Sequence, residues 1–218
     1  MNIVKATEKI TLEEIAKKIA KCQRCPLYKG TTNPVPGHGN PNAKVMFIGE
    51  APGYHEDQQG IPFCGASGQL LDKLLALINI DRKDVFIVNI LKHRPPNNRD
   101  PQPAEIEVCK TWLDQQIEII QPKIIVTLGR FSMYKFMPDV KISQVHGQAR
   151  YVNFNGQQYT VIPMFHPAAA LRRGDVMVKI KEDFQKIPKF LEAQTKPMET
   201  NLTNTDETDK KDEQLGFL

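Results

Sequence analysis

The chain has 218 residues, 40% of them hydrophobic and 25% charged, a composition typical of one globular domain. It holds no run of the roughly 18–20 apolar residues that a membrane helix requires. Its N-terminal residues lack the apolar core of a secretory signal, so we expect a cytoplasmic protein. Residues 193–218 carry three Lys against six acidic residues, whereas residues 1–192 have a net charge of +7. A basic body favours a polyanionic partner.

The first half of the chain predicts helices and strands in alternation. Thr11 and Glu14 have the spacing of a capping box, and Ile15 and Ile19 share one helical face, so we predict a short helix over 11–21. A loop rich in Pro, Gly and Asn follows it, and the stretch GEAPGYHEDQQGIPFCGASG predicts a second long loop. The other elements predicted in this half are strands over 44–49 and 85–90 and helices over 66–79 and 103–120.

The second half adds further elements of both kinds. Residues 123–129 predict a strand, and FSMYKFM, directly after it, predicts a short helix. Asn155-Gly156 is a strong turn signal and predicts a hairpin-like strand pair over 151–164. A last helix is expected near 175–191.

The pattern of these elements indicates the fold class. Continuous β-branched strands that alternate with helices are typical of a parallel sheet covered on both faces. We therefore predict an α/β fold with three layers, α/β/α, around a central, mainly parallel four-stranded sheet. Residues 1–192 form this domain, and the polar, aperiodic residues 193–218 predict a disordered acidic tail. In such sheets ligands bind at the carboxyl ends of the strands, where the predicted loops hold nearly all the unusual chemistry.

The four cysteines, Cys22, Cys25, Cys64 and Cys109, are poor disulfide candidates in a cytosolic chain, because that compartment keeps thiols reduced. Cys22 and Cys25 are separated by two residues, a spacing common among metal and cluster ligands. The sequence therefore favours a metal site that includes this pair.

Four segments carry the most specific motif signal: GEAPGYHED (49–57), GIPFCGASGQLLD (60–72), VNILKHRPPNNRDPQPAEIEVC (88–109) and FHPAAALR (165–172). In this order and spacing they resemble the family 4 uracil-DNA glycosylases, the iron–sulfur branch of that superfamily, from about Cys22 to residue 190. The resemblance implies a monofunctional DNA glycosylase that flips uracil out of DNA and hydrolyses its N-glycosidic bond. The abasic site that remains would enter base excision repair. A non-catalytic, metal-stabilised DNA-binding module of the same fold is the alternative.

Three residues are candidates for holding the flipped base. Phe63 can stack on uracil, although a Phe is more often a plain core residue. The Asn89 amide offers a donor and an acceptor that match uracil O4 and N3–H, whereas cytosine reverses both partners; an Asn there could also cap the loop. By the resemblance, His166 hydrogen-bonds uracil O2 as negative charge builds on the leaving base, and the alternative is a loop histidine bonded to backbone.

The resemblance also implies roles for residues around the base. Glu56 is the better candidate for holding the attacking water or closing the pocket, Glu50 for supporting the loop or the water, and Ala51 for a backbone contact to the base. Leu171 is expected to fill the gap left by the flipped nucleotide, with Arg172 and Arg173 on phosphates.

For the metal, family 4 has four cysteines on a [4Fe–4S] cluster, the third in a Lys-Cys-Arg-Pro-Pro context. Here that context reads Lys92-His93-Arg94-Pro95-Pro96, so we expect Cys22, Cys25, His93 and Cys109 to be the ligands, since imidazole also ligates iron. Three alternatives stay open. The cluster could be three-coordinate with His93 nearby, the site could bind Zn²⁺, or Cys64 could be the fourth ligand.

The last five residues, Gln214–Leu218, read QLGFL. They resemble the Gln-Leu-x-Leu-Phe peptides that bind bacterial sliding clamps, with the last two hydrophobic residues exchanged. A sliding clamp is therefore a candidate partner beside uracil-containing DNA, and we expect the protein itself to be a monomer.

Overall fold

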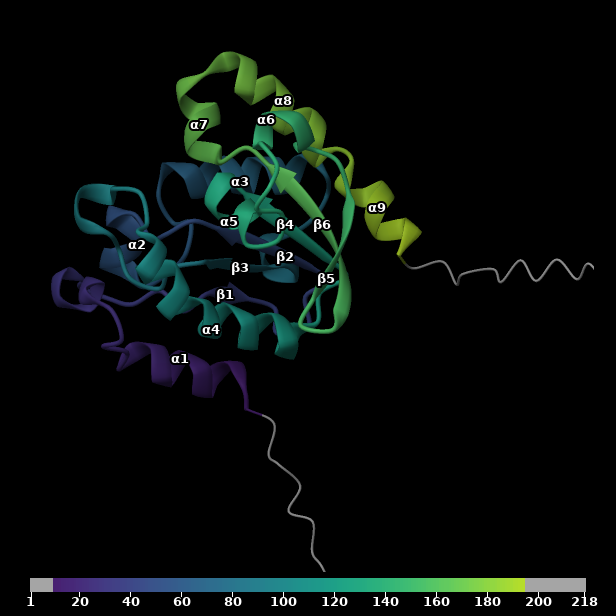
Figure 1. Cartoon of the computed structure of the whole chain (residues 1–218). Coiled ribbons are helices and arrows are strands. Elements are labelled where there is room, and N and C mark those ends of the chain that lie inside the picture. The colour runs from purple at the N-terminus through teal and green to yellow at the C-terminus, as the bar shows by residue number, and fades with distance from the viewer. Residues whose placement is uncertain (1–9, 195–218) are drawn as a thin grey trace, which may run out of the picture.

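The computed structural model describes residues 10–194, which form a three-layer α/β/α arrangement (Figure 1). The central sheet has six strands in the order β1-β3-β2-β4-β6-β5. Its inner four strands are parallel, and the two edge strands, β1 and β5, pair antiparallel to β3 and β6. The strands are β1 His38–Gly39, β2 Val45–Gly49, β3 Phe86–Asn89, β4 Ile124–Leu128, β5 Arg150–Phe154 and β6 Gln157–Met164.

The helices cover both faces of this sheet (Figure 1). Helices α3, α7, α8 and α9 pack on one face, and α1 and α4 lie on the other. The α-helices are α1 Leu12–Ala20, α2 Tyr54–Gln59, α3 Ala66–Leu77, α4 Pro103–Ile120, α5 Arg130–Tyr134, α6 Ile142–Val145, α7 Pro167–Arg172, α8 Gly174–Phe184 and α9 Ile187–Ala193, with 3₁₀ turns at Pro26–Gly30, Arg82–Asp84 and Pro96–Asn98.

The core explains why the inner strands are continuous apolar runs. Every residue of β2, β3 and β4 is buried, because each strand presents one side to each helical layer. Phe47 lies in the core beneath α3 and α8 and stacks on Phe184 with 5.8 Å between ring centroids. Its neighbours Met46 and Ile48 point the other way, into the core beneath α4.

The predicted fold class is confirmed, and the predicted elements agree closely with the structure. The capping box of Thr11 and Glu14 is present at α1, and α4 has the bounds that the sequence predicted. The four parallel strands form the predicted centre, but the sheet has six strands rather than four. The additional edges are β5, part of the predicted hairpin, and β1, which the sequence analysis missed because two residues carry no periodicity.

Two other segments differ from the prediction. The loop predicted after β2 contains the six-residue helix α2, which begins after Gly53 and ends at Gly60 in a left-handed conformation. The single helix predicted near 175–191 is two helices, because Pro188 lies in the first turn of α9, where a proline is tolerated, and cannot continue α8. The predicted tail 193–218 lies, from residue 195 on, outside the described residues.

Within residues 10–194, no helix combines the length and apolar character that crossing a membrane demands.

Candidate functional site

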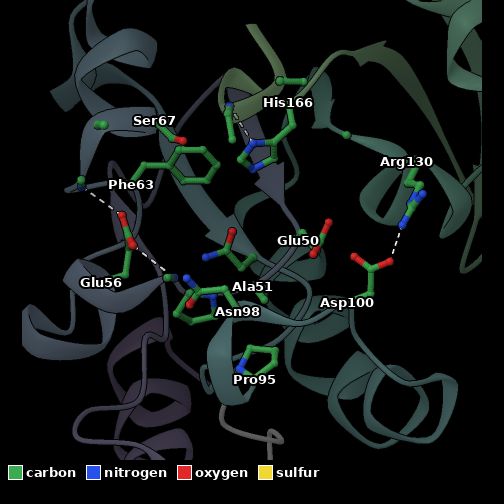
Figure 2. A pocket seen from close by; sticks show the side chains of 18 of the residues that line it. Glu50, Ala51, Glu56, Phe63, Ser67, Pro95, Asn98, Asp100, Arg130 and His166 are labelled. Carbon is green, nitrogen blue, oxygen red and sulfur yellow. Dashed lines mark hydrogen bonds and ion pairs between the residues drawn. The ribbon is translucent and has the colours of Figure 1, made fainter. Parts of the chain in front are cut away.

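A cleft of about 690 Å³ opens where the four parallel strands end (Figure 2). Each of these strands contributes to its lining, as expected for the carboxyl edge of a parallel sheet. Glu50 and Ala51 follow β2, Asn89 ends β3, Gly129 and Arg130 follow β4, and Phe165 and His166 follow β6. The sheet therefore brings together residues that are up to 116 positions apart in the chain.

Phe63 and His166 form one wall of this cleft (Figure 2). Their rings stack with centroids 5.6 Å apart and planes 27° apart. Phe63 has a positive φ of 52°, an uncommon conformation for a bulky residue and one that surrounding packing must hold. The wall presents a flat aromatic surface of the kind on which a nucleobase stacks.

The His166 imidazole has a defined protonation state. Its Nδ1 accepts a hydrogen bond from the Ala168 backbone N–H at 3.1 Å, as the N-cap of α7. Burial lowers the pKa of His166 to about 4, against a smaller opposing influence of Glu56. The ring is therefore neutral near pH 7, and since Nδ1 is the acceptor, Nε2 carries the proton. The backbone hydrogen bond that the sequence analysis gave as the alternative for His166 is present, and it leaves Nε2–H as the ring's other donor.

Asn89 lines the cleft at the end of β3 and is 1% exposed. Its side-chain Oδ1 is buried and has no hydrogen-bond partner among residues 10–194, which costs about 1–3 kcal/mol unless a ligand supplies a donor. Gly49 makes this position available, because a Cβ there would lie 2.6 Å from the Phe63 ring and closer still to Asn89 Oδ1. An unpaired buried acceptor beside an aromatic wall is the cleft's most specific feature.

Glu50 and Glu56 have contrasting surroundings. Burial and, to a lesser extent, the nearby Asp100 carboxylate raise the pKa of Glu50 to about 7, while Arg130 opposes the shift. Glu56, by contrast, accepts three backbone hydrogen bonds, from Gly53 at 3.1 Å and from Cys64 and Gly65 at 3.0 Å each. Figure 2 shows Glu50 between His166 and the Asp100–Arg130 pair, with Glu56 directed to the backbone. The geometry favours Glu50 over Glu56 for holding a water.

Helix α7 carries the predicted DNA-contacting residues on the rim. Leu171 is 49% exposed, large for an apolar side chain at a cleft. Arg172 lines the cleft, whereas Arg173 forms an ion pair of 2.7 Å with Asp175. Of the two predicted phosphate ligands, Arg172 is therefore the one directed to the cleft.

Three of the four predicted metal ligands are the cysteines Cys22, Cys25 and Cys109. Burial is the main cause that raises the pKa of Cys109 to about 11; Cys25 and Cys22 contribute to the same shift, and Lys92 opposes it. Cys25 packs in the same small apolar cluster as Cys109. The indole N–H of Trp112, also in this cluster, is buried and unpartnered, and an anionic sulfur centre is the kind of acceptor that it lacks. These residues fit a thiolate-bound metal in their chemistry.

The fourth predicted ligand, His93, has different neighbours. It is buried, which lowers its pKa, and the charge that opposes this shift is that of Asp57 on α2. In the arrangement that the structure describes, no three His, Cys, Asp or Glu side chains of residues 10–194 gather at ligating positions. Cys64 lies by the cleft loop, its backbone N–H bonded to Glu56.

Two further groups were not singled out from the sequence. Arg130 at the start of α5 forms an ion pair with Asp100 at the rim of the cleft, and LGR after a strand was the one signal for it. Lys92 is fully buried behind Asn89, and the sequence gives no sign of this because lysines are nearly always exposed.

Comparison with known proteins supports one family. Residues 36–192 match the Uracil DNA glycosylase superfamily. Similar curated proteins include the type-4 uracil-DNA glycosylase of Sulfurisphaera tokodaii, 44% identical over 81% of this chain and 83% of that protein. The type-4 enzyme of Archaeoglobus fulgidus is 46% identical over 81% of this chain and 92% of its own length. That of Thermotoga maritima is 38% identical over 86% of this chain and 98% of its own.

Proposed function

The chain belongs to the uracil-DNA glycosylase superfamily and to its type-4 branch, and we propose that the cleft at the strand ends is its active site. The enzyme excises uracil from DNA in base excision repair. It hydrolyses the N-glycosidic bond and leaves an abasic site. To reach that bond it must take the nucleotide out of the base stack and enclose the uracil in a pocket.

The single observation that carries this proposal is the unpaired amide oxygen of Asn89. Uracil presents N3–H to such an acceptor, whereas cytosine has an unprotonated N3 and would leave it unpaired. A site built to receive a donor rejects a base that lacks it by leaving a buried polar group unsatisfied. Phe63 supplies the stacking face beside the same position.

The proposed chemistry needs a stabilised leaving group and a water. As the glycosidic bond breaks, negative charge develops on uracil O2, and the Nε2–H of neutral His166 donates a hydrogen bond to it. Glu50, whose carboxyl titrates near pH 7, orients the water that attacks the sugar carbon and accepts its proton. Glu56 holds the loop that carries Phe63 in place.

Residues on the rim of the cleft are proposed to contact the DNA around the flipped nucleotide. Leu171 inserts where the flipped nucleotide leaves the stack, and Arg172 contacts a phosphate beside it. This part of the proposal rests on exposure and position: His166 is the N-cap of α7, and the exposed Leu171 follows it by about one and a half turns.

For the cofactor, we propose that Cys22, Cys25 and Cys109 hold a [4Fe–4S] cluster, with His93 as the fourth ligand in place of the family's cysteine. The cluster would tie the segment after α1 and the start of α4 to the loop after β3. Its role is structural, and no step of the hydrolysis passes through it. Zn²⁺ on the same residues is the alternative.

The last five residues, which lie outside the described part of the chain, are proposed to bind a sliding clamp. The support for this is the QLGFL sequence alone.

Incubation with an oligonucleotide that contains one uracil tests the function. The strand should break at the uracil only after alkali, because a monofunctional enzyme leaves an intact abasic site. The same strand with cytosine at that position is the control and should stay whole. Absence of scission with enzyme in excess would contradict the proposed activity, and scission without alkali would contradict the monofunctional assignment.

A further inference from the structure

Lys92, in the loop after β3, is an unusual residue to find fully buried, since a lysine loses the hydration of its ammonium. Its Nζ donates one hydrogen bond to the backbone carbonyl of Asn89 and another to Oε1 of Gln116 on α4, each at 2.8 Å. Both acceptors are uncharged. The lysine thus joins the end of a strand to a helix in the layer beneath it.

The contacts of Lys92 continue on both sides. The Gln116 amide donates in turn to the carbonyl of Pro36 at 2.6 Å, and the Lys92 carbonyl accepts from Val35 N–H at 2.7 Å. The segment after β3 is therefore held by the 35–36 loop and by α4.

These hydrogen bonds reach Asn89, the residue that is proposed to recognise uracil. A buried amide oxygen selects its partner only if its position is fixed, since displacements of about 1 Å at such a site cost large factors in rate. The orientation of the last peptide of β3 sets where the Asn89 side chain points, and Lys92 is the group that binds the carbonyl of that peptide.

We propose that Lys92 is a positioning residue for Asn89: its buried side-chain nitrogen, as a hydrogen-bond donor, fixes the end of β3 so that the unpaired amide oxygen meets uracil N3–H. The inference rests on the proposed function. It also places base recognition next to the proposed metal-binding loop, because the residue that bonds Asn89 is the chain neighbour of His93.

A double-mutant cycle between Lys92→Met and Asn89→Ala tests this role, with single-turnover excision of uracil as the readout. Lys92→Met should slow excision roughly tenfold or more in the wild-type background and by less than about twofold in the Asn89→Ala background. Equal slowing in both backgrounds would overturn the proposal, because a merely structural lysine weakens the enzyme whether or not Asn89 is present.

Gln116→Leu is the second variant, and it tests the positioning role if Lys92→Met does not fold. It removes one of the two acceptors of Lys92 and leaves the cysteines unchanged. It should show the same dependence on Asn89, with a smaller effect. The matched control is Lys135→Met, another largely buried lysine, whose partner is Asp114; its effect should not depend on Asn89. If the wild-type enzyme releases no uracil, the proposed function fails; if it does and the cycle is additive, this inference alone fails.

Discussion

Two carboxylates follow β2 within seven residues, and their surroundings assign them different tasks. Glu56 accepts hydrogen bonds from the backbone N–H of Gly53, at the start of α2, and from those of Cys64 and Gly65, directly after Phe63. Glu50 is partly buried, and the charge of Asp100 reinforces the effect of burial on its pKa. A group that titrates near neutral pH is suited to accept a proton from water, so the surroundings of the two carboxylates favour Glu50 as the base.

The pH dependence of excision follows from Glu50. Below pH 7 its carboxyl is increasingly protonated and cannot accept a proton from water, so the rate should rise with pH and level off above about 7. His166 stays neutral through this range because its pKa is about 4. Glu50→Gln should be slower by on the order of 10²-fold and flat with pH. Single-turnover rates of the wild type and of Glu50→Gln, measured between about pH 5 and 9, test both expectations. This is roughly the range in which histidines and carboxyls with a raised pKa titrate.

Asp100→Asn should move that profile in a known direction. Removing the Asp100 charge takes away a repulsion that raises the pKa of Glu50 and frees Arg130, which lowers it. The midpoint should therefore fall to lower pH, with the plateau rate largely kept. If Asp100→Asn leaves the midpoint unchanged and Glu50→Gln keeps the pH dependence of the wild type, a group other than Glu50 controls the reaction.

The sequence was sufficient to place Asn89, Phe63 and His166 in one pocket, because each follows or ends a predicted strand and parallel strands share their carboxyl edge. It was not sufficient to separate Glu50 from Glu56. That distinction depends on where the N–H groups of Cys64 and Gly65 point, which is a property of a loop conformation. Lys92 was missed because its burial comes from contacts with Gln116 on a distant helix.

At the scale of elements, the end of β2 requires a glycine. A Cβ on Gly49 would overlap the Asn89 amide and lie 2.6 Å from the Phe63 ring, so Gly49→Ala must displace one of them. We expect excision to fall by about 10²-fold or more while the circular dichroism spectrum is retained. Gly174→Ala, at the start of α8 where nothing lies within 4 Å of a Cβ, should leave the rate unchanged; equal effects of the two would contradict the packing argument.

The proposed metal ligands come from three parts of the chain: the segment after α1, the loop after β3 and α4. If they hold a metal, Cys109→Ser should remove it and lower the thermal unfolding temperature, because the segment after α1 would lose its tie to α4. The cluster is measured by its absorption shoulder near 400 nm, about where [4Fe–4S] centres absorb, and the metal content by elemental analysis. His93→Cys should hold the cluster more firmly than the wild type. Zinc without iron in protein purified without oxygen would contradict the cluster.

Long periodic elements were predictable, and short ones were not. Helix α3, Ala66–Leu77, lies within the predicted range 66–79 and buries Leu70, Leu71, Leu74 and Leu75, and α4 begins and ends at the predicted residues. Strand β1 exists because His38 and Gly39 pair with β3, and α2 because Glu56 caps its first turn. Strand β1 depends on a tertiary partner that no local pattern contains, whereas α2 is only six residues long, too short for a periodic apolar pattern.

At the scale of the whole molecule, the basic body and the acidic tail suggest separate tasks. The body presents its cleft and α7 to DNA, while residues 214–218 are proposed to bind a sliding clamp. Deleting these five residues should abolish binding to the clamp, measured by surface plasmon resonance, and leave excision from a short oligonucleotide unchanged. Undiminished affinity for the clamp after the deletion would end this idea.

The central claim is that the cleft at the strand ends is where uracil is excised, and His166→Ala tests it most directly. Single-turnover excision from a duplex with one uracil should slow by about 10²–10³-fold, the effect of losing one donor to a developing anion. Binding of an abasic duplex should change little, because the proposed DNA contacts, Leu171 and Arg172, are not altered by this substitution. An unchanged rate of uracil release in His166→Ala would contradict the account.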